Sequence, residues 1–275
     1  MPVAETPALL TIITRTYGQR EGFLQAAAAS VFGQLHRPIE WLIVEDGPSA
    51  AGEVIAAADV PEGIAVCILT NPKLGRSAAA NRGLDEATGA AIMFFDDDDE
   101  LFPNHGSCLM DLLERHPLAA GAYSAAIEAE RATEEPGAQI TAEKIHFRPM
   151  ASSGLLLRAN PFPIQAVVFR RSCVFHQRFD TRLDALEDWL FWTEIFLERD
   201  LVWTPEITSR FYVPASKAVR KRRLKSHRDA ERDYSMQAEA LFAERGLWRW
   251  GEVVAHADRQ LGDLALLARS ELDIA

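Results

Sequence analysis

The chain has 275 residues, 48% of them hydrophobic and 25% charged, which is the composition of a globular protein with a sizeable core. Its formal net charge of -11 argues against a general nucleic-acid-binding protein, because affinity for nucleic-acid phosphates is largely electrostatic. No stretch approaches the roughly 20 apolar residues that span a bilayer, and the N-terminus lacks the features of a signal peptide, so we expect a cytoplasmic location.

The first third of the chain alternates between strand-like and helix-like patterns. Short apolar runs predict strands, and amphipathic segments between them predict helices. The expected strands are 8–13, 39–44, 64–69 and 90–95, and the expected helices are 22–35, 51–58 and 77–88, the last capped by Ser77. This alternation predicts an α/β fold with a Rossmann-like, mostly parallel sheet flanked by helices.

Polar residues follow every expected strand of this sheet. They are Thr14, Arg15 and Thr16; Glu45 and Asp46; Thr70, Asn71 and Lys73; and Asp96 to Asp99. In open parallel sheets, ligands bind beyond the carboxyl ends of the strands, so these residues predict a binding site at one rim of the sheet. The alternative is that they are polar only because loops are exposed.

An uninterrupted acidic run occupies residues 96–100, directly after the fourth expected strand. Neighbouring carboxylates raise one another's pKa values, so a bound cation would explain the run. If the backbone stays extended, Asp96 and Asp98 lie on one face, and Asp97 and Asp99 on the other. Carboxylate oxygens favour Mg2+ or Mn2+ over zinc. The alternative is a solvated acidic turn that begins the next helix.

The middle of the chain is less regular. We expect a helix that ends near residue 116, a strand at 121–127 and another at 164–169. Between these strands, residues 128–154 combine charges with prolines and glycines, which predicts a loop or lid beside the site, or a linker.

A helix at about 184–198 begins with several acids. Asp184 and Glu187 have the spacing of an N-terminal capping pair. Asp188 is not needed for that cap. It could favour the positive end of the helix, or it could present a general base to a cleft, and the residues alone favour the structural role.

The C-terminal part holds the only strongly basic run of the chain, from Lys217 to Arg228, after an expected strand at 207–213. Such a run is usually a solvated helix face or loop, but it could also clamp a diphosphate or contact anionic lipid headgroups. Two terminal helices follow, which could pack on the sheet or against a second chain as a homodimer. We therefore divide the chain into 1–127, 128–215 and 216–275.

Five short motifs, in order, resemble those of the family 2 glycosyltransferases, which have the GT-A fold. They are Thr16-Tyr17-Gly18; Glu45-Asp46-Gly47-Pro48-Ser49; Asn71 and Gly75 with Ala79-Ala80-Asn81-Arg82-Gly83; Asp96-Asp97-Asp98-Asp99; and Glu187-Asp188-Trp189. Each motif is weak alone, but their order and spacing over roughly the first 215 residues make the resemblance specific.

The resemblance implies roles for individual residues on the donor side. A half made of 1–127 would bind the nucleotide-sugar, and 128–215 would bind the acceptor. The nucleotide-binding residues would be Thr14, Thr16 and Asp46 at the base, Asp96 at the ribose, and Asp97 beside it. Asp98, with Asp96, would hold Mn2+ or Mg2+ at the diphosphate. Residue 80 is alanine where the family has arginine, so Arg76 or Arg82 would substitute near the phosphates.

On the acceptor side, the resemblance implies that Asp188 removes the proton of the attacking hydroxyl, with Glu187 and Trp189 nearby. The reaction would be a single displacement that inverts the anomeric carbon. We expect a UDP- or dTDP-sugar donor, a saccharide or lipid-linked acceptor in cell-surface polysaccharide biosynthesis, and a location at the inner face of the membrane. A catalytically idle nucleotide-sugar-binding protein is the alternative, and a nucleotidyltransferase is a weaker one.

Overall fold

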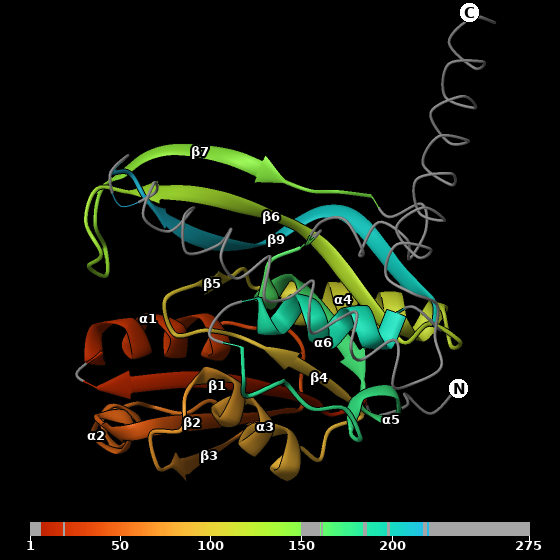
Figure 1. Ribbon diagram of the computed structural model, residues 1–275, viewed down its shortest axis with the longest axis horizontal. Helices are drawn as coiled ribbons and strands as arrows, with labels where there is room; N and C mark the ends of the chain where they lie inside the picture. The colour runs from red at the N-terminus through yellow and green to blue at the C-terminus, as the bar shows by residue number, and fades with distance from the viewer. Residues whose placement is uncertain are drawn as a thin grey trace, which may run out of the picture.

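The computed structural model describes residues 7–18, 20–149, 160, 162–183, 186–196, 199–216 and 219, and all structural statements refer to these residues. They form one mixed sheet whose strands have the order β3-β2-β1-β4-β8-β6-β9-β5, with β7 paired to β6 (Figure 1). The basic run and the expected terminal helices lie outside the described residues, apart from Val219.

The strands are β1 Leu10–Gly18, β2 Ile39–Ser49, β3 Ile64–Asn71, β4 Ala91–Phe94, β5 Glu100–Leu101, β6 Gly121–Arg131, β7 Ile140–His146, β8 Val167–Arg170 and β9 Leu201–Pro214. The helices are α1 Glu21–Phe32, α2 Ala51–Ala56, α3 Arg76–Glu86, α4 His105–Arg115, α5 Arg171–Val174 and α6 Glu187–Phe196, with a 3-10 turn η2 at Ile164–Ala166. β1 to β4 are parallel, as predicted, and β8 joins them to β6 in antiparallel orientation.

Both faces of the parallel part are covered by helices. Ile12 and Ile13 are consecutive in β1 and therefore point to opposite faces, and each enters a different hydrophobic cluster. One cluster packs under α1, α2 and α4, and the other under α3, α5 and α6. This double burial explains why the first strands are continuous apolar runs.

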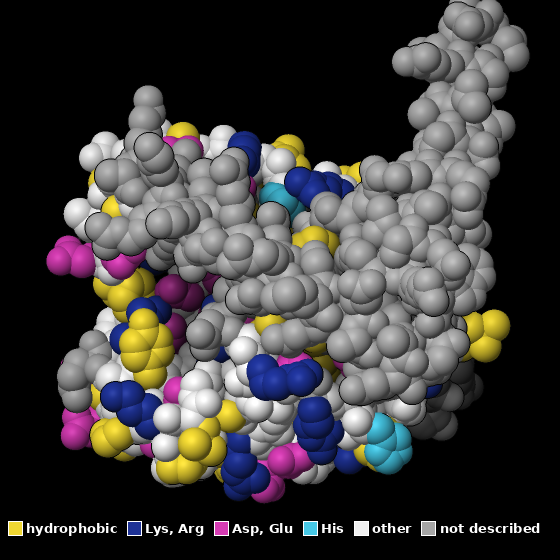
Figure 2. Space-filling model, viewed as in Figure 1, with side chains coloured by type: hydrophobic (Ala, Val, Ile, Leu, Met, Phe, Trp, Pro, Cys, Tyr) yellow, Lys and Arg dark blue, Asp and Glu magenta, His cyan; other side chains and the backbone are white. Residues whose placement is uncertain are grey.

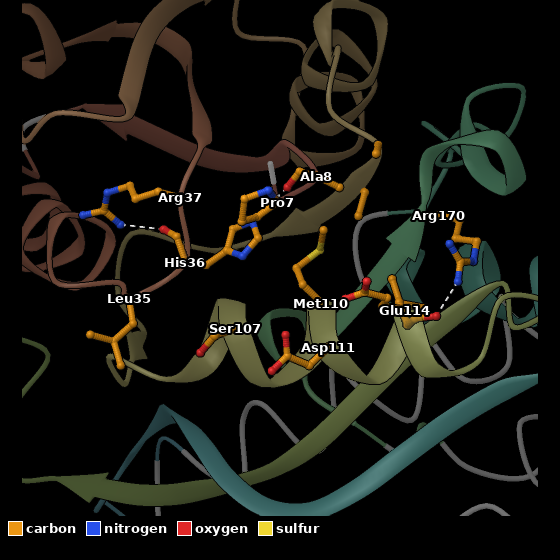
Figure 3. A pocket seen from close by; sticks show the side chains of 13 residues that line it. Pro7, Ala8, Leu35, His36, Arg37, Ser107, Met110, Asp111, Glu114 and Arg170 are labelled. Atoms are coloured by element: carbon orange, nitrogen blue, oxygen red, sulfur yellow. Dashed lines mark hydrogen bonds between the residues drawn. The ribbon is translucent and has the colours of Figure 1, made fainter. Parts of the chain in front are cut away.

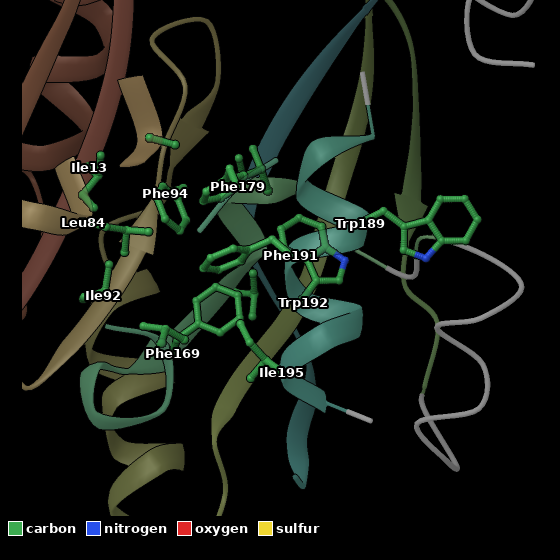
Figure 4. Packing of buried hydrophobic residues seen from close by; sticks show 14 of the residues in the cluster. Ile13, Leu84, Ile92, Phe94, Phe169, Phe179, Trp189, Phe191, Trp192 and Ile195 are labelled. Carbon is green, nitrogen blue, oxygen red and sulfur yellow. The ribbon is translucent and has the colours of Figure 1, made fainter. Parts of the chain in front are cut away.

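Aromatic side chains fix α6 on the sheet. Phe191 stacks on Phe179 with ring centroids 4.1 Å apart and lies edge-on to Phe94 at 5.9 Å. Phe169 of β8 contacts the same helix through Trp192 (Figure 4). Burial of each large aromatic side chain stabilises the fold by roughly 1.5 to 3 kcal/mol, so the start of α6 is held firmly against the end of β4.

Several boundaries of strands and loops that we predicted from the sequence are wrong. β1 and β2 continue through Gly18 and Ser49, because polar residues at their ends still pair with neighbouring strands. The expected loop or lid at 128–154 contains the end of β6 and the whole of β7, which form a hairpin that crosses Figure 1 above α1; the side chains of β7 are almost all exposed. The 127/128 division stays a prediction, although β6 runs across it.

The start of α3 also differs from the prediction. Its N-cap is Gly75, not Ser77, whose hydroxyl is buried without a partner. Gly75 has φ +93°, a conformation that residues other than glycine rarely adopt.

Among the described residues, no helix is long and apolar enough to cross a membrane.

His105 on α4 makes the stability of the fold depend on pH. The side chain is fully buried, its Nδ1 lies 2.7 Å from Thr208 Oγ1, and burial lowers its pKa to about 4. The neutral form is therefore the one that the fold accommodates. The stability that neutral His105 contributes is fully present above pH ~6.5 and is lost as the pH falls toward 4. This loss amounts to about 3 kcal/mol of unfolding free energy.

We predict that His105→Gln removes this part of the pH dependence. Urea unfolding between pH 7 and 4 measures it, and His116→Gln, which changes an exposed histidine just beyond α4, is the control. Equal losses of unfolding free energy on acidification in wild type and His105→Gln would show that His105 is not responsible.

Candidate functional site

A cavity of about 330 Å³ lies at the carboxyl ends of β1 and β2, beside the N-terminus of α3. Three predicted nucleotide-binding residues line it: Thr16, Asp46 and Arg76. The exposed ring of Tyr17 and the backbone of Gly75 belong to the same wall. The first βα units of the sheet thus place these side chains together at the rim where ligands bind in such sheets.

A larger cavity, of about 750 Å³, lies at the opposite rim of the sheet (Figure 3). It is bounded by α4 and by the amino ends of β1 and β4. None of the predicted site residues lines it. Arg170 stands at its edge, and its guanidinium donates to the carbonyl oxygens of Leu113, His116 and Ala119. Size alone therefore does not identify the functional cavity.

Asp46 shapes the turn that leads into α3. One carboxylate oxygen accepts hydrogen bonds from Asn71 Nδ2 at 2.5 Å and Leu74 N at 2.9 Å, and the other accepts one from Gly75 N at 3.0 Å. The side chain still lines the cavity. The carboxylate can form further hydrogen bonds only as an acceptor, so a ligand that binds to Asp46 must supply an N–H or O–H donor.

The two predicted threonines have partners within the protein. Thr14 is fully buried, and its Oγ1 accepts a hydrogen bond from Trp41 Nε1 at 2.9 Å. Thr16 Oγ1 donates to Asp97 Oδ2 at 2.7 Å. Of the two, only Thr16 reaches the cavity wall. Their contacts with a nucleotide base stay predictions.

The acidic run is not extended, so the predicted alternation of its carboxylates is wrong. β4 ends at Phe94, and the backbone turns so that Asp99 N donates to Asp96 O at 3.3 Å. Asp97 and Asp98 consequently share one arginine, with Arg20 Nη2 2.8 Å from Asp97 and 3.2 Å from Asp98. Asp96 faces other partners. Asp96 pairs with Arg15 and Arg76, so it and Asp98 have different arginine partners.

Arginines neutralise this run unevenly. Burial alone would raise the pKa of Asp96, but Arg15 and Arg76 lower it below its usual value. Burial raises the pKa of Asp97 despite Arg20. Burial and the charges of Asp98 and Asp96 together raise the pKa of Asp99 well above its usual value. Burial and mutual repulsion thus oppose ionisation of Asp97 and Asp99, and a cation bound beside the run would favour their charged forms.

The donor atoms at this turn are carboxylate oxygens, which suit Mg2+ or Mn2+. Asp98 is half-exposed and Asp96 is partly exposed, so both are accessible. No group of three or more His, Cys, Asp or Glu side chains among the described residues could hold a metal by itself. Mg2+ is commonly bound by one or two carboxylates together with substrate phosphates, and the two aspartates fit that arrangement.

Four side chains form a closed set of ion pairs, which we call the charge ring: Arg15, Asp96, Arg76 and Glu187. Arg15 donates to Asp96 through Nε at 2.8 Å and Nη2 at 2.7 Å, and to Glu187 through Nη1 at 3.1 Å. Arg76 Nε lies 2.7 Å from Glu187, and its Nη2 lies 3.6 Å from Asp96. The ring joins the ends of β1 and β4 to the starts of α3 and α6.

Asp188 follows the ring on α6. Burial and the neighbouring charge of Glu187 raise its pKa to about 7, and Arg76 and Arg15 act in the opposite direction. Asn160 Nδ2 lies 3.5 Å from Asp188 Oδ2, and Trp192 Nε1 donates to Asn160 Oδ1 at 3.1 Å. A partly buried carboxylate with a pKa near neutrality is suited to accept a proton.

Trp189 is buried, and its indole points away from Phe94 and Phe169 in Figure 4. Leu186, just before α6, has φ +62°, which is unusual for leucine and turns the chain sharply into the helix. Asp184, the predicted capping partner of Glu187, lies outside the described residues. Within the described residues, Glu187 forms ion pairs with Arg15 and Arg76 of the charge ring.

Sequence reasoning assigned no role to three residues that the structure brings to the site: Arg15, Arg20 and Asn160. The sequence identifies Arg15 only as one of the polar residues that follow the first expected strand. Of the two arginines proposed near the phosphates, Arg76 lines the cavity, whereas Arg82 pairs with Glu86 on the surface of α3. Figure 2 shows acidic side chains set back in a hollow on the described surface.

Comparisons with solved structures identify the fold. The mannosyltransferase PcManGT from Pyrobaculum calidifontis, in complex with GDP-Man and Mn2+, gives a TM-score of 0.56 at 18% identity, over 97% of this chain and 83% of that one. S. aureus TarS 1-349 in complex with UDP gives 0.56 at 16% identity, over 74% of this chain and 60% of that one. The chain therefore has the GT-A fold, as predicted.

Relatives by sequence match a shorter segment. The uncharacterized glycosyltransferase YibD of Escherichia coli K12 is 30% identical over 103 residues, which are 38% of this chain and 30% of YibD. The uncharacterized glycosyltransferase MJ1057 of Methanocaldococcus jannaschii is 28% identical over 97 residues, 34% of this chain and 33% of MJ1057. The matched segment thus spans about a third of each relative. The family model named Glycosyl transferase family 2 matches residues 11–172, more than half of the chain, and the chain belongs to this family.

Proposed function

We propose that the chain is an inverting, metal-dependent glycosyltransferase that moves a sugar from a nucleotide-diphosphate donor to an acceptor hydroxyl. The observation that carries the proposal is the charge ring, which links the rim of the 330 Å³ cavity to Asp188, a carboxylate with a pKa of about 7. Such a transfer requires a nucleotide-binding site and a proton acceptor that are held close to each other.

The donor would bind in the cavity beside α3. Asp46 would accept the N–H of a uracil or thymine base, with Thr14 and Thr16 near the base, and Asp96 and Asp97 would lie toward the ribose. The complexes of TarS with UDP and UDP-GlcNAc and of PcManGT with GDP-Man support a nucleotide-sugar donor.

The diphosphate would lie between Arg76 and the acidic turn. Arg76 is half-exposed at the N-terminus of α3, a position that favours phosphate binding. Asp98, with Asp96, would hold Mg2+ or Mn2+. A divalent ion there supplies Lewis-acid stabilisation of the departing diphosphate, and the Mn2+ in the PcManGT complex supports this assignment.

Asp188 would remove the acceptor's proton while the acceptor oxygen attacks the anomeric carbon and the bond to the diphosphate breaks. A single displacement inverts the configuration at that carbon. Glu187 and Trp189 would flank the acceptor. A saccharide or lipid-linked acceptor, a homodimer, a cytoplasmic location and contact of Lys217 to Arg228 with the membrane stay predictions, as does a role in cell-surface polysaccharide biosynthesis.

We predict that Asp188→Asn lowers the transfer rate by about 100- to 10,000-fold, because the amide cannot accept the proton. The affinity for the nucleoside diphosphate should change little, since Asp188 is absent from the wall of the cavity. Release of nucleoside diphosphate measures turnover, and calorimetry measures binding. In the wild type, the rate should rise with pH through about 7 as Asp188 loses its proton.

Glu114→Gln is the matched control, because this carboxylate lies at the opposite rim and should leave both quantities unchanged. Asp188→Asn turning over at the wild-type rate would remove Asp188 from the mechanism. Wild type that binds UDP and Mn2+ but transfers no sugar to a broad acceptor panel would instead favour an idle nucleotide-sugar-binding protein.

The metal assignment predicts that UDP binds more tightly with Mn2+ than without it, and that Asp98→Asn reduces this gain by about tenfold or more. Titration calorimetry of UDP with and without Mn2+ measures the gain without requiring activity. Asp111→Asn, an exposed acid at the opposite rim, is the control and should retain the full gain. A wild-type affinity for UDP that is the same with and without divalent ions would refute the assignment.

A further inference from the structure

Arg15 is the more deeply buried of the two cations of the charge ring. It lies near the carboxyl end of β1, in the middle of the parallel part of the sheet, and only 6% of its side chain is exposed. Arg76, the other cation of the ring, is 48% exposed. Both arginines line the 330 Å³ cavity, but the guanidinium of Arg15 is committed to partners inside the protein, whereas Arg76 is open to a ligand.

The contacts of Arg15 use the planar geometry of its guanidinium. Nε and Nη2 form a two-pronged contact with both oxygens of Asp96, and Nη1 reaches Glu187, whose side chain is 1% exposed. Because the guanidinium is rigid, these bonds fix the end of β4 relative to the start of α6. Lysine would keep the charge but could not hold both carboxylates in that geometry.

The two carboxylates belong to different parts of the proposed site. Asp96 opens the acidic turn on the nucleotide side, and Glu187 directly precedes Asp188, the proposed base. Burying these acids without a cation would be costly, so the ring constrains their positions strongly.

We propose that Arg15 is a positioning residue: it holds the acidic turn and the start of α6 at the spacing that the transfer requires, without contacting the reacting atoms. This inference rests on the proposed function and adds to it a residue that acts through Asp96 and Glu187. A misplacement of about 1 Å between donor and base can cost roughly 100-fold in rate.

The first test compares Arg15→Lys with Arg170→Lys. Arg170 is also a partly buried arginine of the sheet, but it donates only to main-chain carbonyls at the opposite rim. We expect Arg15→Lys to lower kcat by about 10- to 100-fold, a larger factor than its loss of affinity for UDP with Mn2+. Arg170→Lys can lower the melting temperature but should keep the wild-type kcat.

The second test is chemical rescue. In Arg15→Ala, added guanidinium ion should restore part of kcat by binding between Asp96 and Glu187, and it should not raise the kcat of Arg170→Ala. If Arg15→Ala does not fold, the lysine variant decides the question alone.

The outcomes separate two failures. Wild type that turns over no nucleotide-sugar would overturn the proposed function, and the role of Arg15 with it. An active wild type with Arg15→Lys at the same kcat would overturn the positioning role alone. The same follows if Arg15→Lys loses kcat only in proportion to its loss of folded protein, as a purely structural residue would.

Discussion

The charge ring is the interaction on which the rest of the site depends. Two carboxylates, Asp96 and Glu187, leave bulk water, and Arg15 and Arg76 compensate both. Since an uncompensated buried charge costs several kcal/mol, the four side chains must stay together in the folded protein. Their backbones are then fixed as well, and the ends of β1 and β4 meet the starts of α3 and α6.

This constraint explains the electrostatics around it. Glu187 draws two arginines to the start of α6, but its own charge, together with burial, raises the pKa of Asp188. On the other side, Arg20 holds Asp97 and Asp98, whereas Asp99 keeps a raised pKa. A cation at the acidic turn, where we propose a divalent ion, would favour the charged form of Asp99, and Asp188 provides a proton acceptor at α6.

Local patterns in the sequence predicted the parallel part of the sheet and its binding rim, because strands buried on both faces are continuous apolar runs and polar residues follow them. The same reasoning missed β7, whose side chains are almost all exposed, so it has no apolar face to detect. It also considered an acidic run that continues the strand in extended form. That run turns, and its carboxylates pair with Arg15 and Arg20, far away in the sequence.

The role of Arg15 could not be predicted for a related reason. Glu187 is 172 positions away from it, and no periodicity or spacing connects the two. The family resemblance identified Glu187 and Asp188 by their motif but offered no partner for Glu187. Only the three-dimensional arrangement reveals that the partner lies in the first strand.

A crystal structure of the chain with Mn2+ and a UDP-sugar would test the central claim most directly. The account predicts a nucleotide in the 330 Å³ cavity, a metal on Asp98 at the diphosphate, and the anomeric carbon facing Asp188, with Arg15 still joining Asp96 to Glu187. A nucleotide bound at the opposite rim, or a sugar turned away from Asp188 with the charge ring open, would contradict it.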